Sequence, residues 1–183
     1  LHCYNNQLTS LDVSGLINLN TFYCYDNQLT NLDVSGLKYL NFFYCYNNQL
    51  KSLDVSGFKY LKLFNCANNK LSSLFIKNNN FSWESLSFDN NPELVFICAD
   101  EKDLNSLQSK INDYGYSTTC NVNSYCSFNP GGVFYTVNGQ NKLDENNNGC
   151  DADDADYPNL KYTITNGTIS GDLISNKSGN YAI

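Results

Sequence analysis

The chain has 183 residues and carries 18 acidic against 11 basic side chains, which gives a net charge of −7 at neutral pH. Nucleic-acid recognition depends on clustered Lys and Arg, so this composition argues against a nucleic-acid partner. It disfavours an anionic membrane surface for the same reason. No apolar run approaches the roughly 20 residues of a membrane span, so we expect no membrane insertion of this segment.

A 21-residue repeat organises the first half of the chain. The pentapeptide LDVSG starts at Leu11, Leu32 and Leu53. One position of the repeat is always cysteine and another is always asparagine (Cys3, Cys24, Cys45 and Cys66; Asn6, Asn27, Asn48 and Asn69). A fixed period of this length indicates a solenoid, and the long regular surfaces of solenoids are typical of binding proteins.

The spacing of the apolar residues identifies the kind of repeat. One copy reads Leu19-x-x-Phe22-x-Cys24-x-x-Asn27-x-Leu29, which does not follow the 3.6-residue period of a helix. It resembles the leucine-rich repeat, L-x-x-L-x-L-x-x-N-x-L, over roughly residues 1–100. The variant with LDVSG and cysteine is similar to short repeats in secreted proteins of Bacteroidetes-type bacteria.

The resemblance implies an α/β-type repeat solenoid of mostly strands and turns, with a parallel strand at each Phe-x-Cys. The cysteines of the repeat are expected in its interior, where they act as small hydrophobic residues; a metal or redox role is the alternative. A buried amide without hydrogen-bond partners costs about 1–3 kcal/mol. The resemblance therefore implies that the amides of the repeat bond neighbouring turns as a buried ladder of Asn6, Asn27, Asn48 and Asn69.

The repeats are expected to occupy residues 1–93 and to be followed by a C-terminal cap at 94–128. A last strand is expected at Leu86-x-Phe88-x-x-Asn91, one residue out of phase. Helical spacing follows in residues 104–111, with Gly115 as a stop signal. A solenoid needs such an atypical terminal unit to cover its last core layer. Since the chain starts inside a repeat, we interpret it as part of a longer protein.

Four cysteines lie outside the repeat, at Cys98, Cys120, Cys126 and Cys150. An even number of cysteines in a loop-rich region predicts disulfides and an oxidising compartment, so we expect a secreted or cell-surface protein. Of the three possible connectivities we favour Cys98–Cys120 with Cys126–Cys150. A zinc site is the weaker alternative, because no two of these cysteines form a C-x-x-C pair.

Residues 129–183 have the alternating apolar pattern and turn signals of antiparallel strands. The ending Asn176-x-x-Gly179-x-Tyr181 resembles that of the small immunoglobulin-like β-sandwich modules of bacterial surface proteins. The resemblance implies that this segment is the beginning of such a β-sandwich. The composition shift at residues 129–132 indicates a linker or the entry to a strand.

An acidic loop in this segment is a candidate calcium site. The run that starts at Asp144 matches the pattern D-x-N-x-N-G, in which oxygen ligands alternate before a glycine turn. The twelfth position is Ala155 rather than the bidentate glutamate. The sequence allows two interpretations of this loop. It either binds calcium or is a solvated loop of Asx-turns. The candidate ligands are Asp144, Asn146, Asn148 and Asp151.

Tyrosines recur beside the buried strand positions, which face the concave surface in a leucine-rich repeat. Exposed aromatic patches often mark binding sites, and tyrosine suits protein hot spots and sugar stacking. Cross-strand stacking that only stabilises the sheet is the alternative. The candidate residues are Tyr4, Tyr23, Tyr25, Tyr44 and Tyr46.

The sequence predicts a recognition module without catalytic activity. The single histidine, His2, has no evident nucleophile and acid beside it, so a catalytic triad cannot be assembled. We expect the concave face to bind a protein or host-surface partner. A polysaccharide-binding adhesin and a structural stalk without a ligand are the two alternatives. No cofactor is expected, apart from the calcium ion discussed above.

Overall fold

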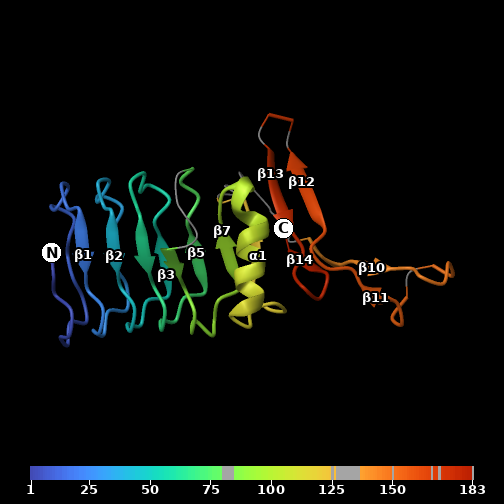
Figure 1. Cartoon of the computed structure of the whole chain (residues 1–183), viewed down its shortest axis with the longest axis horizontal. Coiled ribbons are helices and arrows are strands. Elements are labelled where there is room, and N and C mark those ends of the chain that lie inside the picture. Colours follow the sequence, from blue (N-terminus) through green and yellow to red (C-terminus); the bar gives the residue numbers. More distant parts are fainter. Residues whose placement is uncertain are drawn as a thin grey trace. The chain divides into compact units, whose positions relative to one another are not determined.

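The computed structural model describes residues 1–79, 85–124, 126, 137–149, 151–165, 167–168 and 170–182. The chain divides into two compact units, Leu1–Phe96 and Ile97–Ile183, which are described separately below (Figure 1). Within the described residues, no helix is both long enough and apolar enough to cross a lipid bilayer.

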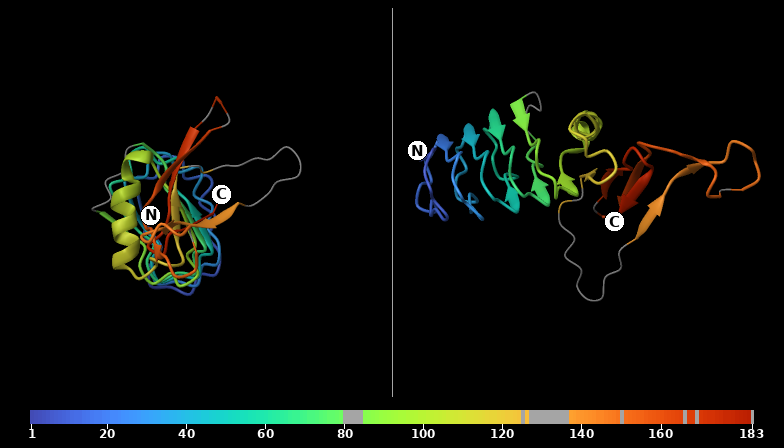
Figure 2. Two further views of the ribbon diagram at one scale, coloured as in Figure 1. Left: turned by 90° about the vertical axis from the view of Figure 1, so that its right-hand side faces the viewer. Right: turned by 90° about the horizontal axis from the view of Figure 1, so that it is seen from below.

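Unit 1 is a stack of coils, and each coil contributes one short strand to a parallel sheet (Figure 2). Phe22 lies opposite Phe43, and Phe43 lies opposite Phe64, so the register follows the repeat. The last pair places Leu86 opposite Phe64, one residue out of phase with the earlier coils. The sheet consists of β1 (Thr21–Tyr23), β2 (Phe42–Tyr44), β4 (Leu63–Asn65) and β6 (Leu86–Ser87), in that order. This arrangement is compatible with a leucine-rich-repeat solenoid.

The LDVSG segments form a second side of each coil. Here β3 (Ser52–Asp54) pairs in parallel with β5 (Ser73–Phe75). In all three copies the aspartate Oδ1 accepts a hydrogen bond of 2.9 Å from the backbone N–H of the serine two residues later. The conserved spacing of Asp and Ser within the pentapeptide therefore produces an Asx-turn that ends this side of the coil.

The core of unit 1 repeats one layer per coil. The rings of Phe22, Phe43 and Phe64 stack with centroid separations of 5.4 and 5.5 Å, and all three are fully buried. Each buried phenylalanine contributes about 1.5–3 kcal/mol to stability. Cys24 and Cys45 are free thiols in the same core, and burial raises the pKa of the Cys45 thiol well above its usual range. These thiols are therefore packing groups and not nucleophiles.

Unit 2 begins with a helix packed on a small antiparallel sheet. The helix α1 (Leu104–Asp113) follows the 3₁₀ turn Glu101–Asp103 and ends before Gly115, whose φ of +83° breaks the helix as the sequence predicts. Its buried side chains pack against β8 (Asn121–Asn123) and β13 (Ser170–Ile174). Strand β13 pairs antiparallel with β8 and with β12 (Lys161–Thr165), while β7 (Phe96–Cys98) leads into this unit.

The remaining strands of unit 2 form two antiparallel pairs. One joins β9 (Asn138–Gln140) to β14 (Asn180–Ala182), and the other joins β10 (Lys142–Leu143) to β11 (Ala155–Asp156). Because β8 of the expected cap pairs with β13 of the expected β module, these two segments share one sheet and belong to one unit. The linker expected at residues 129–132 lies outside the described residues.

Candidate functional site

The five predicted tyrosines lie together on unit 1, in two columns of stacked rings that we call the tyrosine face. In the first column Tyr4 stacks on Tyr25 at 4.6 Å between ring centroids, and Tyr25 stacks on Tyr46 at 4.5 Å. In the second, Tyr23 stacks on Tyr44 at 4.9 Å. The rings within each column are parallel to within 5–12°. The stacking therefore places a continuous aromatic array on one side of the coils.

The position of the tyrosine face follows from strand geometry. Successive side chains of a strand point to opposite faces, and neighbouring strands lie about 4.7–4.9 Å apart. Phe22 and Cys24 therefore enter the core while Tyr23 and Tyr25 point outward. The ring separations equal the strand spacing because the tyrosines occupy identical repeat positions. His2 extends the second column and stacks on Tyr23 at 4.7 Å.

Stacking decides which atoms of the tyrosine face a partner can reach. Each inner ring is covered on its flat sides by the rings above and below it, so the ring edges and hydroxyl groups remain accessible. Desolvation, and to a smaller extent the neighbouring groups Tyr4 and Asp26, raise the pKa of Tyr25. Desolvation is also the largest cause of the raised pKa of Tyr46. The hydroxyls of Tyr25 and Tyr46 are therefore neutral hydrogen-bonding groups at physiological pH.

Polar residues border the tyrosine face on one side. Asp26 and Asn47 directly follow the tyrosines of their coils, with φ angles of +54° and +52°. The Asn47 Nδ2 donates a 2.6 Å hydrogen bond to the Asp26 Oδ1. Asn and Asp tolerate this left-handed backbone better than other residues with a side chain. On the fourth coil the tyrosine positions are taken by Asn65 and Ala67, where the columns end.

The ladder of asparagines holds the coils at this spacing. In Asn27, Asn48 and Asn69 the amide nitrogen donates to the cysteine carbonyls of its own coil and of the preceding coil, and the amide oxygen accepts a leucine N–H of the preceding coil. All these bonds measure 3.0–3.1 Å. Asn91 extends the ladder into the last coil. Its place in the sequence is indicated by the last strand pattern, which lies one residue out of phase with the earlier repeats. The predicted first member, Asn6, is instead exposed, and its side chain bonds only its own coil.

The cysteines of unit 2 pair differently from the prediction. The disulfide joins Cys98 to Cys126, with a Cα–Cα distance of 5.3 Å. The predicted Cys98–Cys120 pair and the predicted Cys126–Cys150 pair are therefore both wrong. Cys120 is a free, fully buried thiol, and burial raises its pKa to about 12. It belongs to the packing of unit 2, while Cys150 lies outside the described residues.

The acidic loop uses its oxygens on its own backbone. Both carboxylate oxygens of Asp144 accept backbone N–H bonds, at 3.2 Å from Asn148 and at 2.9 Å from Gly149. Asn146 and Asp151 each accept one from the residue two positions later. Within the described residues, no three His, Cys, Asp or Glu side chains are grouped to hold a metal ion. This arrangement is a series of Asx-turns, and calcium binding by the loop stays a prediction.

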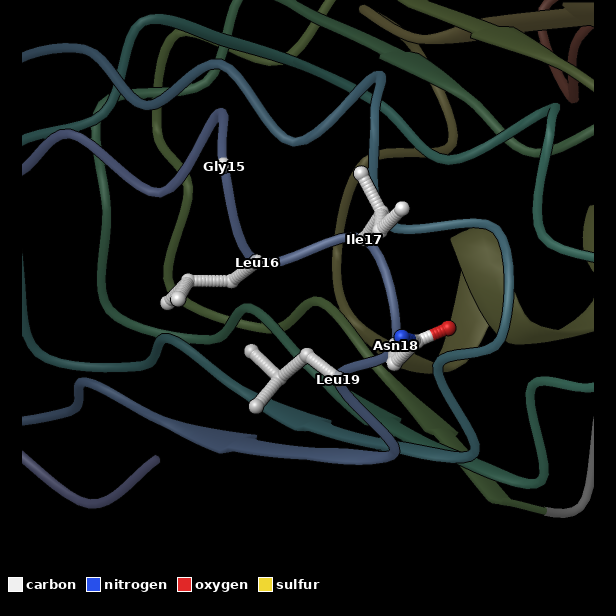
Figure 3. A pocket seen from close by; sticks show the side chains of 5 residues that line it. All are labelled: Gly15, Leu16, Ile17, Asn18 and Leu19. Atoms are coloured by element: carbon white, nitrogen blue, oxygen red, sulfur yellow. The ribbon is translucent and has the colours of Figure 1, made fainter.

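A pocket of unit 1 lies on a loop of the first coil (Figure 3). Its lining is Gly15, Leu16, Ile17, Asn18 and Leu19, with no titratable side chain, so it offers no catalytic or metal-binding chemistry. The equivalent loops of the next two coils carry Tyr39 and Tyr60, which are more than half exposed. No role was predicted for these two residues, although the dipeptide Lys-Tyr recurs one repeat apart.

Comparison with known proteins finds one similar solved structure. No protein-family profile and no curated protein matches the sequence. Over 55% of its length the chain is similar to a solved structure of the functional domain of InlJ from Listeria monocytogenes, described as including a cysteine ladder. The sequences are 32% identical and the TM-score is 0.45. The chain spans about a quarter of that relative, since the match covers 24% of the InlJ chain.

Proposed function

We propose that the chain is a non-catalytic recognition module that binds a protein partner through the tyrosine face. The observation that carries this proposal is the pair of stacked columns, with rings 4.5–4.9 Å apart. Tyrosine dominates protein interfaces because it combines a rigid apolar ring with a hydroxyl group. Rings held by their neighbours lose little conformational freedom when a partner binds, and this lowers the cost of association.

The stacking also favours a protein over a sugar as the ligand of the tyrosine face. An aromatic residue that binds sugar by stacking offers the flat side of its ring, and the inner rings Tyr23 and Tyr25 are covered on both flat sides by their neighbours. Ring edges and hydroxyls suit the mixed apolar and hydrogen-bonding surface of a polypeptide. The bordering pair of Asp26 and Asn47 adds further donors and acceptors.

We further propose that the protein acts outside the cytoplasm, at the cell surface or after secretion. The disulfide between Cys98 and Cys126 supports this location, because such bonds persist in oxidising compartments and are rare in the cytosol. In this setting the β strands of unit 2 serve as a spacer beyond the repeats. We also propose that this segment is the beginning of an immunoglobulin-like β-sandwich.

The proposal is tested with a tyrosine-face variant on an array of surface proteins and glycans. The variant changes Tyr23, Tyr25, Tyr44 and Tyr46 to serine, and a second variant changes the same four to phenylalanine. The matched control is Tyr39→Ser with Tyr60→Ser, because these tyrosines lie in different loops of the same coils. Circular dichroism verifies that each variant folds.

We expect the parent and the control to bind protein spots, and the serine variant to lose at least about tenfold in affinity, as loss of a hot-spot cluster does. The phenylalanine variant keeps the stacked rings and loses only the hydroxyls. The difference between its affinity and that of the parent therefore measures how much the hydroxyls contribute to binding. Equal binding by parent and folded serine variant would contradict the proposal and favour the structural stalk. Binding to glycan spots that depends on the same four tyrosines would favour the adhesin.

A further inference from the structure

A second aromatic surface lies on loops of unit 1 away from the parallel strands. Residues 36–41 and 57–62 read GLKYLN and GFKYLK, so consecutive coils present the same Lys-Tyr pair. Tyr39 and Tyr60 are 53% and 52% exposed. Their ring planes are parallel to within 13°, but their centroids are 6.1 Å apart, a wider separation than in either column of the tyrosine face. Both rings therefore keep much of their surface open to a ligand.

The charge of these loops is opposite to that of the chain. They carry Lys38, Lys59 and Lys62 and no aspartate or glutamate, whereas the whole chain has a net charge of −7. Within the described residues, Lys38 and Lys62 form no ion pair and are exposed. The nearest preceding carboxylates, Asp33 and Asp54, accept backbone N–H bonds in their own turns. The loops are therefore a local basic patch on an acidic protein.

We propose that this lysine–tyrosine rim (Lys38, Tyr39, Tyr60 and Lys62) binds an acidic polysaccharide whose sugar units carry carboxylates. A uronate combines an apolar ring face, which suits an exposed tyrosine, with a carboxylate that pairs with a lysine ammonium. A linear polymer that crosses the coils meets one exposed lysine and one exposed tyrosine in each of the two loops. Lysines alone would attract an acidic polypeptide equally well. The exposed tyrosine rings favour the polysaccharide, because they can stack on its sugar rings.

The net charge of the chain makes the proposal sharply testable. A protein of charge −7 repels a polyanion over the range of the Debye length, about 8 Å at physiological salt. Retention on a polyanion therefore requires a local site, and general ion exchange cannot supply it. The site is separate from the tyrosine face, so the two proposals fail or succeed independently.

The experiment measures binding of the whole chain to immobilised polygalacturonate, with dextran as the neutral polysaccharide and polyglutamate as the acidic polypeptide. The rim variants are Tyr39→Ser with Tyr60→Ser, and Lys38→Gln with Lys62→Gln. The matched control is Lys51→Gln with Lys70→Gln, which removes the same charge from exposed positions elsewhere on unit 1. All substituted side chains are exposed, and circular dichroism verifies the fold.

We expect the parent to bind polygalacturonate and not dextran, each rim variant to lose at least about tenfold in affinity, and the control to stay within about twofold. The serine variant of the tyrosine face should bind polygalacturonate like the parent. Three outcomes would overturn the proposal: no binding above dextran, equal losses in the control and the lysine variant, or polyglutamate binding as tight as polygalacturonate and unaffected by the tyrosine substitutions.

Discussion

Replacing Asn48 by alanine should lower the free energy of unfolding of unit 1 substantially. The side chain is only 8% exposed. Its Nδ2 donates to the carbonyls of Cys24 at 3.0 Å and of Cys45 at 3.1 Å, and its Oδ1 accepts the N–H of Leu29 at 3.0 Å. Alanine leaves the Leu29 N–H without its partner. The carbonyls of Cys24 and Cys45 each lose one of two donors and keep the amides of Asn27 and Asn69.

The magnitude follows from one unsatisfied donor and two weakened acceptors. A buried polar group that loses its partner costs about 1–3 kcal/mol, and each carbonyl that loses one of two hydrogen bonds costs about 0.5–1.5 kcal/mol. The cavity left by the carboxamide admits water that regains part of the lost hydrogen bonding, so each group is counted near the lower end of its range. The loss expected for Asn48→Ala is therefore about 2–4 kcal/mol, which is a large share of the stability of a domain of this size.

Urea unfolding followed by circular dichroism measures this loss, with two further variants as controls. Asn6→Ala removes an exposed side chain that bonds only its own coil, so it should cost about 1 kcal/mol or less. Asn48→Asp keeps the size but turns a carboxylate oxygen toward two carbonyls, so it should cost at least as much as alanine. A loss in Asn48→Ala no larger than in Asn6→Ala, or an Asn48→Asp variant as stable as the parent, would refute the reasoning.

Three further predictions concern unit 2. Replacing Cys98 and Cys126 by alanine should lower the free energy of unfolding by about 3–4 kcal/mol, because the disulfide closes a loop across a sequence separation of 28. Urea unfolding without reductant measures this loss, and an unchanged midpoint would contradict it. Burial raises the pKa of Cys120 to about 12, against about 8.5 in an unfolded chain, so the native state keeps a proton that the unfolded chain releases. The contribution of this thiol to stability is complete below about pH 8 and falls by up to about 1.4 kcal/mol per pH unit toward pH 12; urea titrations across that range should show a shallower decline in Cys120→Ala. Gly179 has a φ of +73°, and an added Cβ would lie 2.7 Å from a backbone oxygen, so Gly179→Ala should cost about 2 kcal/mol or more in the same assay. Gly167→Ala, with positive φ but open space around it, should cost about half as much.

The parts of the fold that repeat could be predicted from the sequence. Identical residues one period apart place Phe22 opposite Phe43 and Tyr25 on Tyr46, because each coil copies the backbone of the previous one. The helix after the repeats was equally readable, since its apolar spacing and its glycine stop are local signals. The prediction was thus right for these elements, whose determinants lie within one or two repeat lengths, and wrong for Asn6, which is exposed.

The parts that depend on distant contacts could not be predicted in the same way. Ser124 bonds Asp172 across a sequence separation of 48, and no local pattern announces that β8 joins β13. The disulfide follows from that packing. Cys120 lies at the start of β8 and turns into the core, while Cys126 reaches Cys98, and spacing alone cannot distinguish these two directions.

The chemistry of the two aromatic surfaces depends on where in the repeat a tyrosine stands. Beside the strand, the backbone ladder fixes neighbouring rings at 4.5–4.9 Å, so each ring covers the next and offers edges and hydroxyls. In the loops the separation widens to 6.1 Å, and more than half of each side chain stays exposed. The sequence shows which residues recur but not this difference in spacing, which the structure supplies. In our proposals, a single repeat unit therefore builds a protein-binding face and a sugar-binding rim from the same amino acid, and lysine at the rim completes the distinction by selecting an acidic ligand.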